Sequence, residues 1–191
     1  MMPYEPLPGD IFLCDSQRTG ARIVKFLQAE PTVWHYLLKV IRRKPINTVR
    51  YYHAGMVLDS NTAIEQQWKV QTRPVTDILN RDIIIYRHQD MVTSPEYQRE
   101  LSERALQDTG KTYDIPQIVG KLLTWITGLK IFVRLLGAIS TENEICVTRV
   151  ADWYWPLCHF GVRTKHEVTT HILDEYCSSE RQWAVVYINK A

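Results

Sequence analysis

The feature that most constrains the fold is a series of short apolar strands with little chain between them. Strand-like sequence runs from Arg50 to Leu58, returns after a turn as 63–70, and comes a third time as 82–87. Short turns of this kind join antiparallel neighbours, because parallel neighbours need a long crossover. With further strands expected at 11–14 and 183–188, the sheet should be mainly antiparallel.

Helical sequence lies before, between and after these strands. Apolar residues recur at helical spacing in several segments, and Pro at the start or Gly at the end marks some boundaries. The predicted segments are 21–29, 33–43, 95–109 and 146–155, with single helical turns at 74–79 and within 166–174. Helices that flank a block of strands indicate an α+β fold, and the absence of a linker favours one domain over 1–191.

Composition is that of an ordinary soluble protein, with 45% hydrophobic and 23% charged residues among 191. The formal net charge of +2 gives no reason to expect a nucleic acid partner. A small basic cluster at 39–44 is expected to be a solvated helix end. The first residues lack a basic segment followed by an apolar run, so we expect no signal peptide and a cytoplasmic location.

The longest apolar stretch is 115–139, which Gly128 divides near its middle. Its basic residues are Lys121, Lys130 and Arg134. These charges disfavour a transmembrane helix, so we expect two short amphipathic helices that pack on the core. The alternative is a peripheral contact with a membrane surface, with Trp125 and Phe132 at the interface.

Cys146 is the best candidate nucleophile among the cysteines. It opens a predicted helix, and a helix N-terminus favours the negative thiolate, which is the reactive form. Cys14 ends an apolar strand and is expected to be a packed thiol. Cys158 and Cys177 are expected in or near loops, with no helix start beside them. The alternative for Cys146 is a buried helical cysteine without chemistry.

His53 and Glu65 are the candidate partners of that thiol. His53 begins a predicted strand and could take and return the proton of a nucleophile. Ala54 and Gly55 follow it, and such small residues permit close approach of a backbone or a substrate. Glu65 lies on the returning strand, where it could accept the second N–H of the imidazole. A structural histidine and an exposed strand glutamate are the alternatives.

Taken together, six segments in order resemble the circularly permuted NlpC-type papain-like hydrolases. The matching group is YiiX/YebB-like and is related to lecithin retinol acyltransferase-like proteins. The segments include an opening Gly-Asp strand, a His strand, a Glu strand, a Gly-x-x-Tyr-Asp motif and a nucleophile helix. They are residues 8–13, 52–58, 63–65, 72–75 with 82–87, 110–114 and 145–150.

The resemblance implies a papain-like fold with a helical insertion at about 115–139, and a cysteine hydrolase of the amidase or peptidase kind. It assigns Cys146 as nucleophile, His53 as general base and acid, and Glu65 as orienting residue. It also implies that the hydroxyl of Tyr113 helps to hold the oxyanion. One departure is that Val147 and Thr148 follow the cysteine, where the family commonly has Ser and Glu.

Three alternatives stay open. The same fold could act as a lipid acyltransferase or thioesterase, so the substrate could be a peptide, another amide or a lipid ester. It could also be a non-catalytic binding protein. A metal site would have to use Cys158, His159, His166, His171 and Cys177. These residues contain no Cys-x-x-Cys or His-x-x-x-His pair, so we expect neither a metal nor another cofactor.

Overall fold

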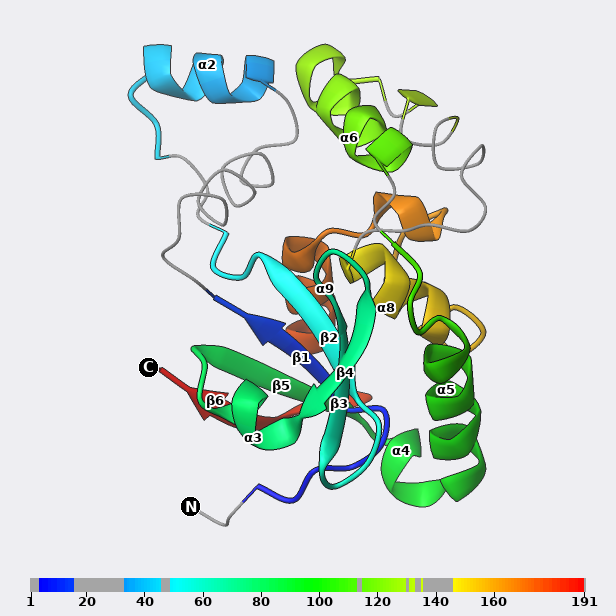
Figure 1. The fold of residues 1–191 in the computed structure, drawn as a ribbon. Helices are drawn as coiled ribbons and strands as arrows, with labels where there is room; N and C mark the ends of the chain where they lie inside the picture. The colour runs from blue at the N-terminus through cyan, green and yellow to red at the C-terminus, as the bar shows by residue number, and fades with distance from the viewer. Residues whose placement is uncertain are drawn as a thin grey trace.

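The computed structural model describes residues 4–15, 33–45, 49–112, 115–129, 131–132, 135 and 146–190. A six-stranded sheet in the order β4-β3-β2-β1-β5-β6 organises these residues, and every strand pairing is antiparallel (Figure 1). The strands are β1 Ile11–Cys14, β2 His53–Val57, β3 Thr62–Gln66, β4 Val70–Pro74, β5 Ile83–His88 and β6 Trp183–Asn189. The mainly antiparallel sheet predicted from the sequence is thus confirmed.

Helices lie on both sides of this sheet, and the arrangement is an α+β fold consistent with a papain-like architecture. The α-helices are α2 Val33–Ile41, α3 Val75–Leu79, α4 Asp90–Thr93, α5 Pro95–Gln107, α6 Ile115–Thr127, α8 Cys146–Tyr154 and α9 Thr170–Ser179. A short 3-10 helix spans Lys165–Glu167. Helices α8 and α9 lie behind the sheet in Figure 1, and α3 lies in front of it.

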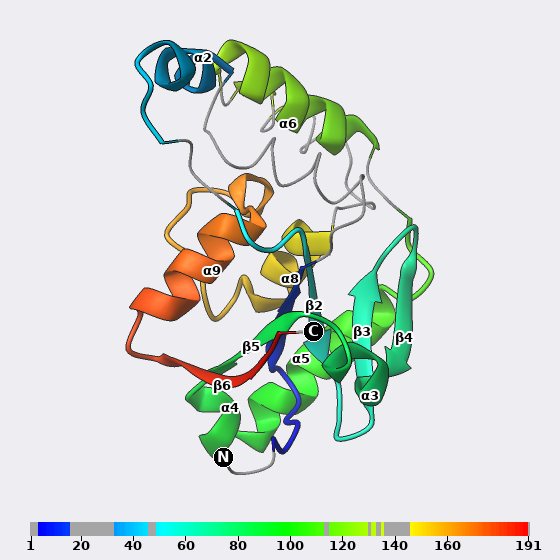
Figure 2. The same cartoon turned by 90° about the vertical axis from the view of Figure 1, so that its left-hand side faces the viewer.

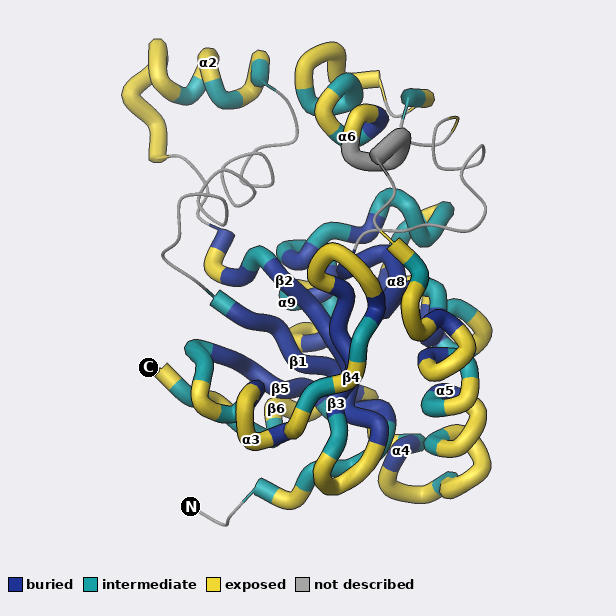
Figure 3. The backbone as a smooth tube through the Cα atoms, viewed as in Figure 1, coloured by how far each residue is buried: buried dark blue, intermediate teal, exposed yellow. Residues whose placement is uncertain are grey.

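Two apolar cores follow from the alternation of side chains along the strands. In β1, Ile11 and Leu13 belong to the core shared with α5, α8 and α9. Phe12 and Cys14 face the other side, where they pack with residues of α3. All four residues of β1 are buried, as expected for a strand near the middle of a sheet covered on both faces (Figure 3).

Several predicted boundaries are confirmed by local chemistry. The side chain of Ser94 caps α5 by accepting a hydrogen bond from the Tyr97 N–H at 3.4 Å, and Pro95 occupies the first helical position. Just beyond the end of α5, Gly110 has a φ of 88°, which an L side chain rarely adopts. The helix has ended at Gln107, and Gly110 permits the turn that follows its C-cap residue Asp108.

Other predictions need correction. The expected single strand over 63–70 is two strands, because the chain turns at 67–69 and β4 starts at Val70. The one helical turn expected within 166–174 is the ten-residue helix α9, which Thr169 caps. Helix α4 is not predicted from the sequence. The predicted helix over 21–29 lies outside the described residues.

Helices α2 and α6 lie side by side beyond the end of the sheet at which β2 begins (Figures 1 and 2). We call residues 33–45 and 115–129 the cap. The Lys121 ammonium donates a hydrogen bond of 2.8 Å to the Val168 carbonyl, which ties α6 to the segment before α9. Within the described parts of the chain, no helix has both the length and the apolarity needed to cross a membrane.

Candidate active site

The structure brings His53 and Glu65 together on neighbouring strands. His53 opens β2, and Glu65 on β3 pairs in register with Gly55, two residues further along. Because alternate residues share one face of a strand, both side chains lie on the same side of the sheet. Imidazole Nε2 is 3.0 Å from carboxylate Oε2, and both residues are buried. An ionised carboxylate only accepts hydrogen bonds, so Nε2–H is the donor.

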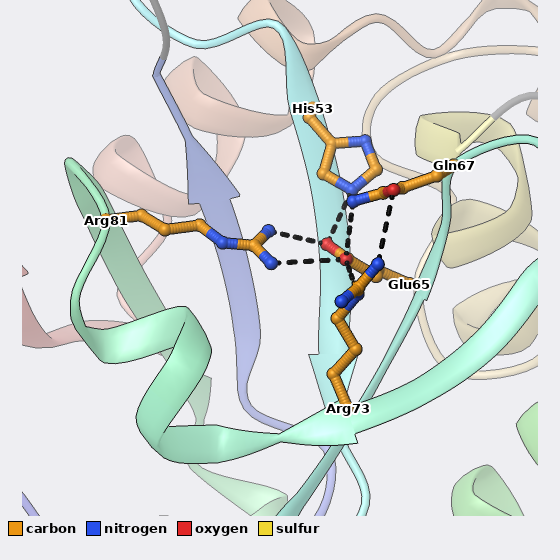
Figure 4. A network of polar contacts seen from close by, with 5 residues as sticks. All are labelled: His53, Glu65, Gln67, Arg73 and Arg81. Atoms are coloured by element: carbon orange, nitrogen blue, oxygen red, sulfur yellow. Dashed lines mark hydrogen bonds and ion pairs between the residues drawn. The ribbon is translucent and has the colours of Figure 1, made fainter.

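Two arginines and a glutamine hold the Glu65 carboxylate (Figure 4). Arg81 reaches both oxygens, with Nη1 2.8 Å from Oε2 and Nη2 3.3 Å from Oε1. Arg73 Nε lies 2.8 Å from Oε1 in an ion pair, and the Gln67 amide donates to the same oxygen at 2.9 Å. The carboxylate therefore has little freedom to turn away from His53.

The charge state of Glu65 follows from these contacts. Burial alone would raise the pKa of this carboxyl group, because a buried charge is poorly solvated. The hydrogen bonds and positive charges of His53 and Arg81 outweigh burial and lower the pKa to about 2. Glu65 is thus an anion at any pH at which the protein would act.

The charge state of His53 is set by Cys146 as well as by Glu65. Burial alone would lower the pKa of the imidazole. The charge of the Cys146 thiolate and its hydrogen bond to the ring, together with Glu65, raise that pKa to about 9. Because Nε2 is engaged by Glu65, Nδ1 is left for the cysteine, and Figure 4 shows it on the far side of the ring.

Cys146 is the first residue of α8, which packs against β2. The other three cysteines are also free thiols, and burial raises the pKa of each of them. Cys14 sits opposite His53 in the β1–β2 register, yet burial raises its pKa to about 12. The predicted packed thiol at Cys14 is confirmed. Cys177 was expected in or near a loop, but it is buried inside α9.

The departure at 147–148 is explained by packing. Val147 is part of the apolar core together with Val150 and Ala151, and Thr148 is fully buried. In this chain the two positions after the cysteine therefore contribute to the protein interior. The apolar side chain at 147 is the one that this environment favours.

Gly55 is needed for packing inside the sheet. A Cβ at this position would lie 2.2 Å from Cζ of Phe12 and 2.7 Å from the Ile64 carbonyl oxygen. The small residue predicted to admit a close neighbour does admit one, but the neighbour is the Phe12 ring and not a substrate. Gly55 thus lets the β1 aromatic side chain lie against β2 beside the site.

Tyr113 lies outside the described residues, so its part in an oxyanion site stays a prediction from the family resemblance.

Across the described parts of the chain, no group of three or more His, Cys, Asp or Glu residues could hold a metal ion. The donor set does not fit a metal there, and we derive no step through one.

Arg73 and Arg81 are the site residues that the sequence does not predict. Arg73 lies on β4, directly opposite Ala63 of β3, two residues from Glu65. The β3–β4 hairpin brings Arg73 beside the carboxylate. The sequence pattern predicts one strand over 63–70 and therefore misses this hairpin. Recognising Gln67 and its neighbours as a turn would have revealed it. Arg81 comes from the turn after α3, and its sequence carries no comparable signal.

Comparison with known proteins supports the fold. No protein-family model matches the sequence, and no curated protein matches it significantly. Among solved structures, the chain is similar to the metalloprotein YiiX from Escherichia coli O157:H7, with a TM-score of 0.59 and 15% identity. The match covers 98% of this chain and 100% of that one. At this identity the likeness shows a YiiX-like fold and nothing about activity.

Proposed function

We propose that this protein is a cysteine-dependent acyl hydrolase, of the amidase or peptidase kind, with Cys146 as its nucleophile. The observation that carries the proposal is a single imidazole with two partners. Nε2 of His53 donates a hydrogen bond of 3.0 Å to Glu65, and the charge and hydrogen bonding of Cys146, at the start of α8, raise the pKa of the same ring. A nucleophile, a base and a residue that orients the base are the three parts such chemistry requires.

The reaction would begin with the Cys146 thiolate attacking the carbonyl carbon of an amide or ester. The protonated His53 then gives its proton to the leaving nitrogen or oxygen as the bond to the carbonyl carbon breaks. An acyl thioester stays on Cys146. His53, now neutral, takes a proton from water, the resulting hydroxide attacks the thioester, and the thiolate leaves.

Two further groups have roles in this proposal. The backbone N–H of Cys146 belongs to the first turn of α8, where the aligned peptide dipoles favour negative charge. It would donate to the oxyanion of the tetrahedral intermediate, with the Tyr113 hydroxyl as second donor. Glu65 acts as a positioning residue that stabilises the imidazolium and fixes its orientation.

The family resemblance supports the same class of chemistry. Among the residues that match the permuted papain-like motifs, His53 and Glu65 lie 3.0 Å apart and Cys146 raises the pKa of the same imidazole, and the match to the YiiX-like fold covers 98% of this chain. The second candidate is a lipid acyltransferase or thioesterase, in which the acyl group comes from a lipid. It is favoured by the exposed apolar residues of the cap, which lies beyond the end of the sheet where His53 stands.

The proposal is tested by trapping the acyl-enzyme. The protein is mixed with p-nitrophenyl acetate at neutral pH, and intact-mass and peptide mass spectrometry locate the acetyl group. We expect acetylation of Cys146, with slow release to water, in the wild type and in Cys158→Ala as matched control. No acetylation is expected in Cys146→Ala. Acetyl transfer that persists in Cys146→Ala, or none in the wild type, would favour the non-catalytic alternative.

A further inference from the structure

Helix α2 turns its apolar side toward water. Trp34, Leu37, Leu38 and Ile41 occupy positions i, i+3, i+4 and i+7, which places them on one face of the helix. They are 60%, 41%, 47% and 75% exposed, and no residue of α2 is buried. In a globular protein this stripe would normally face the core, so its exposure needs a reason.

Helix α6 repeats the pattern beside it. Val119, Leu122 and Ile126 share one face of α6 by the same spacing, Leu129 follows just beyond the end of the helix, and each of these residues is exposed. Because α2 and α6 contact each other, the two stripes belong to one surface element, which Figure 3 shows largely in yellow and teal. Exposed apolar residues elsewhere in the described chain, such as Val92 and Val185, come from separate elements.

The charge of the cap is of one sign. Neither 33–45 nor 115–129 contains an Asp or a Glu, whereas both contain basic residues. Arg42, Arg43 and Lys44 follow directly on the α2 stripe, and all three are exposed. Helix α5 differs, since it mixes Glu and Arg on its solvent side.

We propose that the cap is a docking surface for a membrane that contains anionic lipids. Short helices with one apolar face, a tryptophan and flanking Lys or Arg lie in the plane of the lipid headgroups. Exposed basic residues such as Arg42 and Arg43 complement anionic headgroups. A second copy of the chain fits less well, because pairing two caps would bring like charges together.

Docking would place the candidate active site close to the lipid surface. The cap lies beyond the end of the sheet at which β2 begins, and His53 is the first residue of that strand (Figures 1 and 2). The docking proposal does not depend on catalysis, so it is tested equally well on the wild type and on Cys146→Ala. If it holds, lipid-linked acyl groups become the first substrates to examine.

The experiment is co-sedimentation of the full chain with vesicles. One set is pure phosphatidylcholine, and the other is an equimolar mixture of phosphatidylcholine and phosphatidylglycerol. We expect binding to the mixed vesicles, weak or no binding to the neutral ones, and release by high salt, which screens the headgroup charge. Cys146→Ala should bind like the wild type.

Two variants separate the apolar and the charged contributions. Leu37→Ser/Leu38→Ser/Ile41→Ser should bind mixed vesicles at least about tenfold more weakly, because each side chain loses apolar area buried in lipid. Arg42→Gln/Arg43→Gln should lose roughly 30-fold, from about fivefold for each basic residue. The matched control is Val92→Ser/Leu106→Ser/Val185→Ser, which removes equally exposed apolar residues outside the cap and should bind normally.

The proposal is overturned if mixed vesicles do not retain the protein. It is equally overturned if the cap variant and its control bind alike, or if neutral vesicles bind as tightly as anionic ones. Sedimentation velocity is run without lipid on the same proteins. A dimer that the Leu37→Ser/Leu38→Ser/Ile41→Ser variant abolishes, together with no vesicle binding, would assign the stripes to a contact between two copies.

Discussion

The helices α8 and α2 are of the same length and both are amphipathic, yet they use their apolar residues in opposite ways. Eight of the nine residues of α8 are buried, and its N-terminus presents Cys146 to His53. None of the nine residues of α2 is buried, although its apolar residues follow an equally clear helical spacing. Helical periodicity alone therefore does not distinguish a helix buried in the core from a helix whose apolar face is exposed to solvent.

The difference separates the molecule into a body and a cap. The body is the sheet with α3, α5, α8 and α9. In it even the charged Glu65 is buried, and its carboxylate contacts His53, Arg81 and Arg73. In the cap, large apolar side chains lie in water. Substitutions of buried residues in the body should cost activity or stability, and substitutions of the exposed cap residues should cost neither.

The largest expected effect in the body comes from the base. His53→Ala should lower hydrolysis of an activated ester by roughly 10²–10⁴-fold, because the proton transfers lose their catalyst. The matched control is His171→Ala, which removes a half-buried histidine on α9 that lies outside the site. Glu65→Gln should lose less activity, since it removes an orienting residue and not the base. Initial rates at neutral pH give this comparison, and an equal loss for His171→Ala would refute the assignment.

The same two variants should rank in the opposite order for stability. Glu65→Gln leaves Arg73 and Arg81 without their buried carboxylate, which should lower the free energy of unfolding by about 3 kcal/mol. His53→Ala keeps both ion pairs and should cost less. Urea denaturation measures both values. If His53→Ala is the more destabilising variant, the arginines do not depend on Glu65 as described.

The pH dependence of hydrolysis should show the raised pKa of His53. Its ordinary value of 6.5 becomes about 9 in the folded protein, so the ring stays protonated through neutral pH. The rate of acylation should then fall about tenfold per pH unit once the pH rises above about 9, as the proton for the leaving group is lost. A plot of kcat/KM against pH measures where this fall occurs. A fall centred near 6.5 would contradict the coupling to Cys146.

A smaller effect is expected from the packing beside the site. Gly55→Ala forces a Cβ against the Phe12 ring and the Ile64 carbonyl, which should destabilise the protein by about 1–3 kcal/mol. Gly110→Ala is not a fair control, because the φ of Gly110 is positive. The exposed Thr93→Ala serves instead and should change little. Thermal unfolding of both variants would show whether the tight contact exists.

The smallest effect should come from the cap. Leu37→Ser/Leu38→Ser/Ile41→Ser exchanges exposed residues, so each substitution should change the free energy of unfolding by no more than about 0.5 kcal/mol. Leu13→Ser, from the middle of the buried sheet, is the contrasting variant and should unfold the protein far more readily. A large loss of stability in the cap variant would mean that these residues pack on the body.

The sequence predicts the fold class, most strands and the His53–Glu65 contact, because each depends on local patterns. Alternation of side chains and short turns define β2 and β3, and a hairpin pairs the two strands so that His53 and Glu65 lie on the same face of the sheet. The sequence does not predict Arg81, because a long side chain from a turn can reach many places. The sequence also does not predict which apolar stripe is buried. Periodicity shows that a helix has an apolar face, but not whether another element packs against that face.

The claim that Cys146 and His53 form a reactive pair is tested most directly by alkylation. The folded protein is treated with iodoacetamide at neutral pH, and peptide mass spectrometry follows each cysteine over time. We predict that Cys146 is alkylated much faster than Cys14, Cys158 and Cys177, whose pKa values burial raises, and that His53→Ala slows it. Alkylation of Cys146 no faster than that of Cys158 would contradict the account.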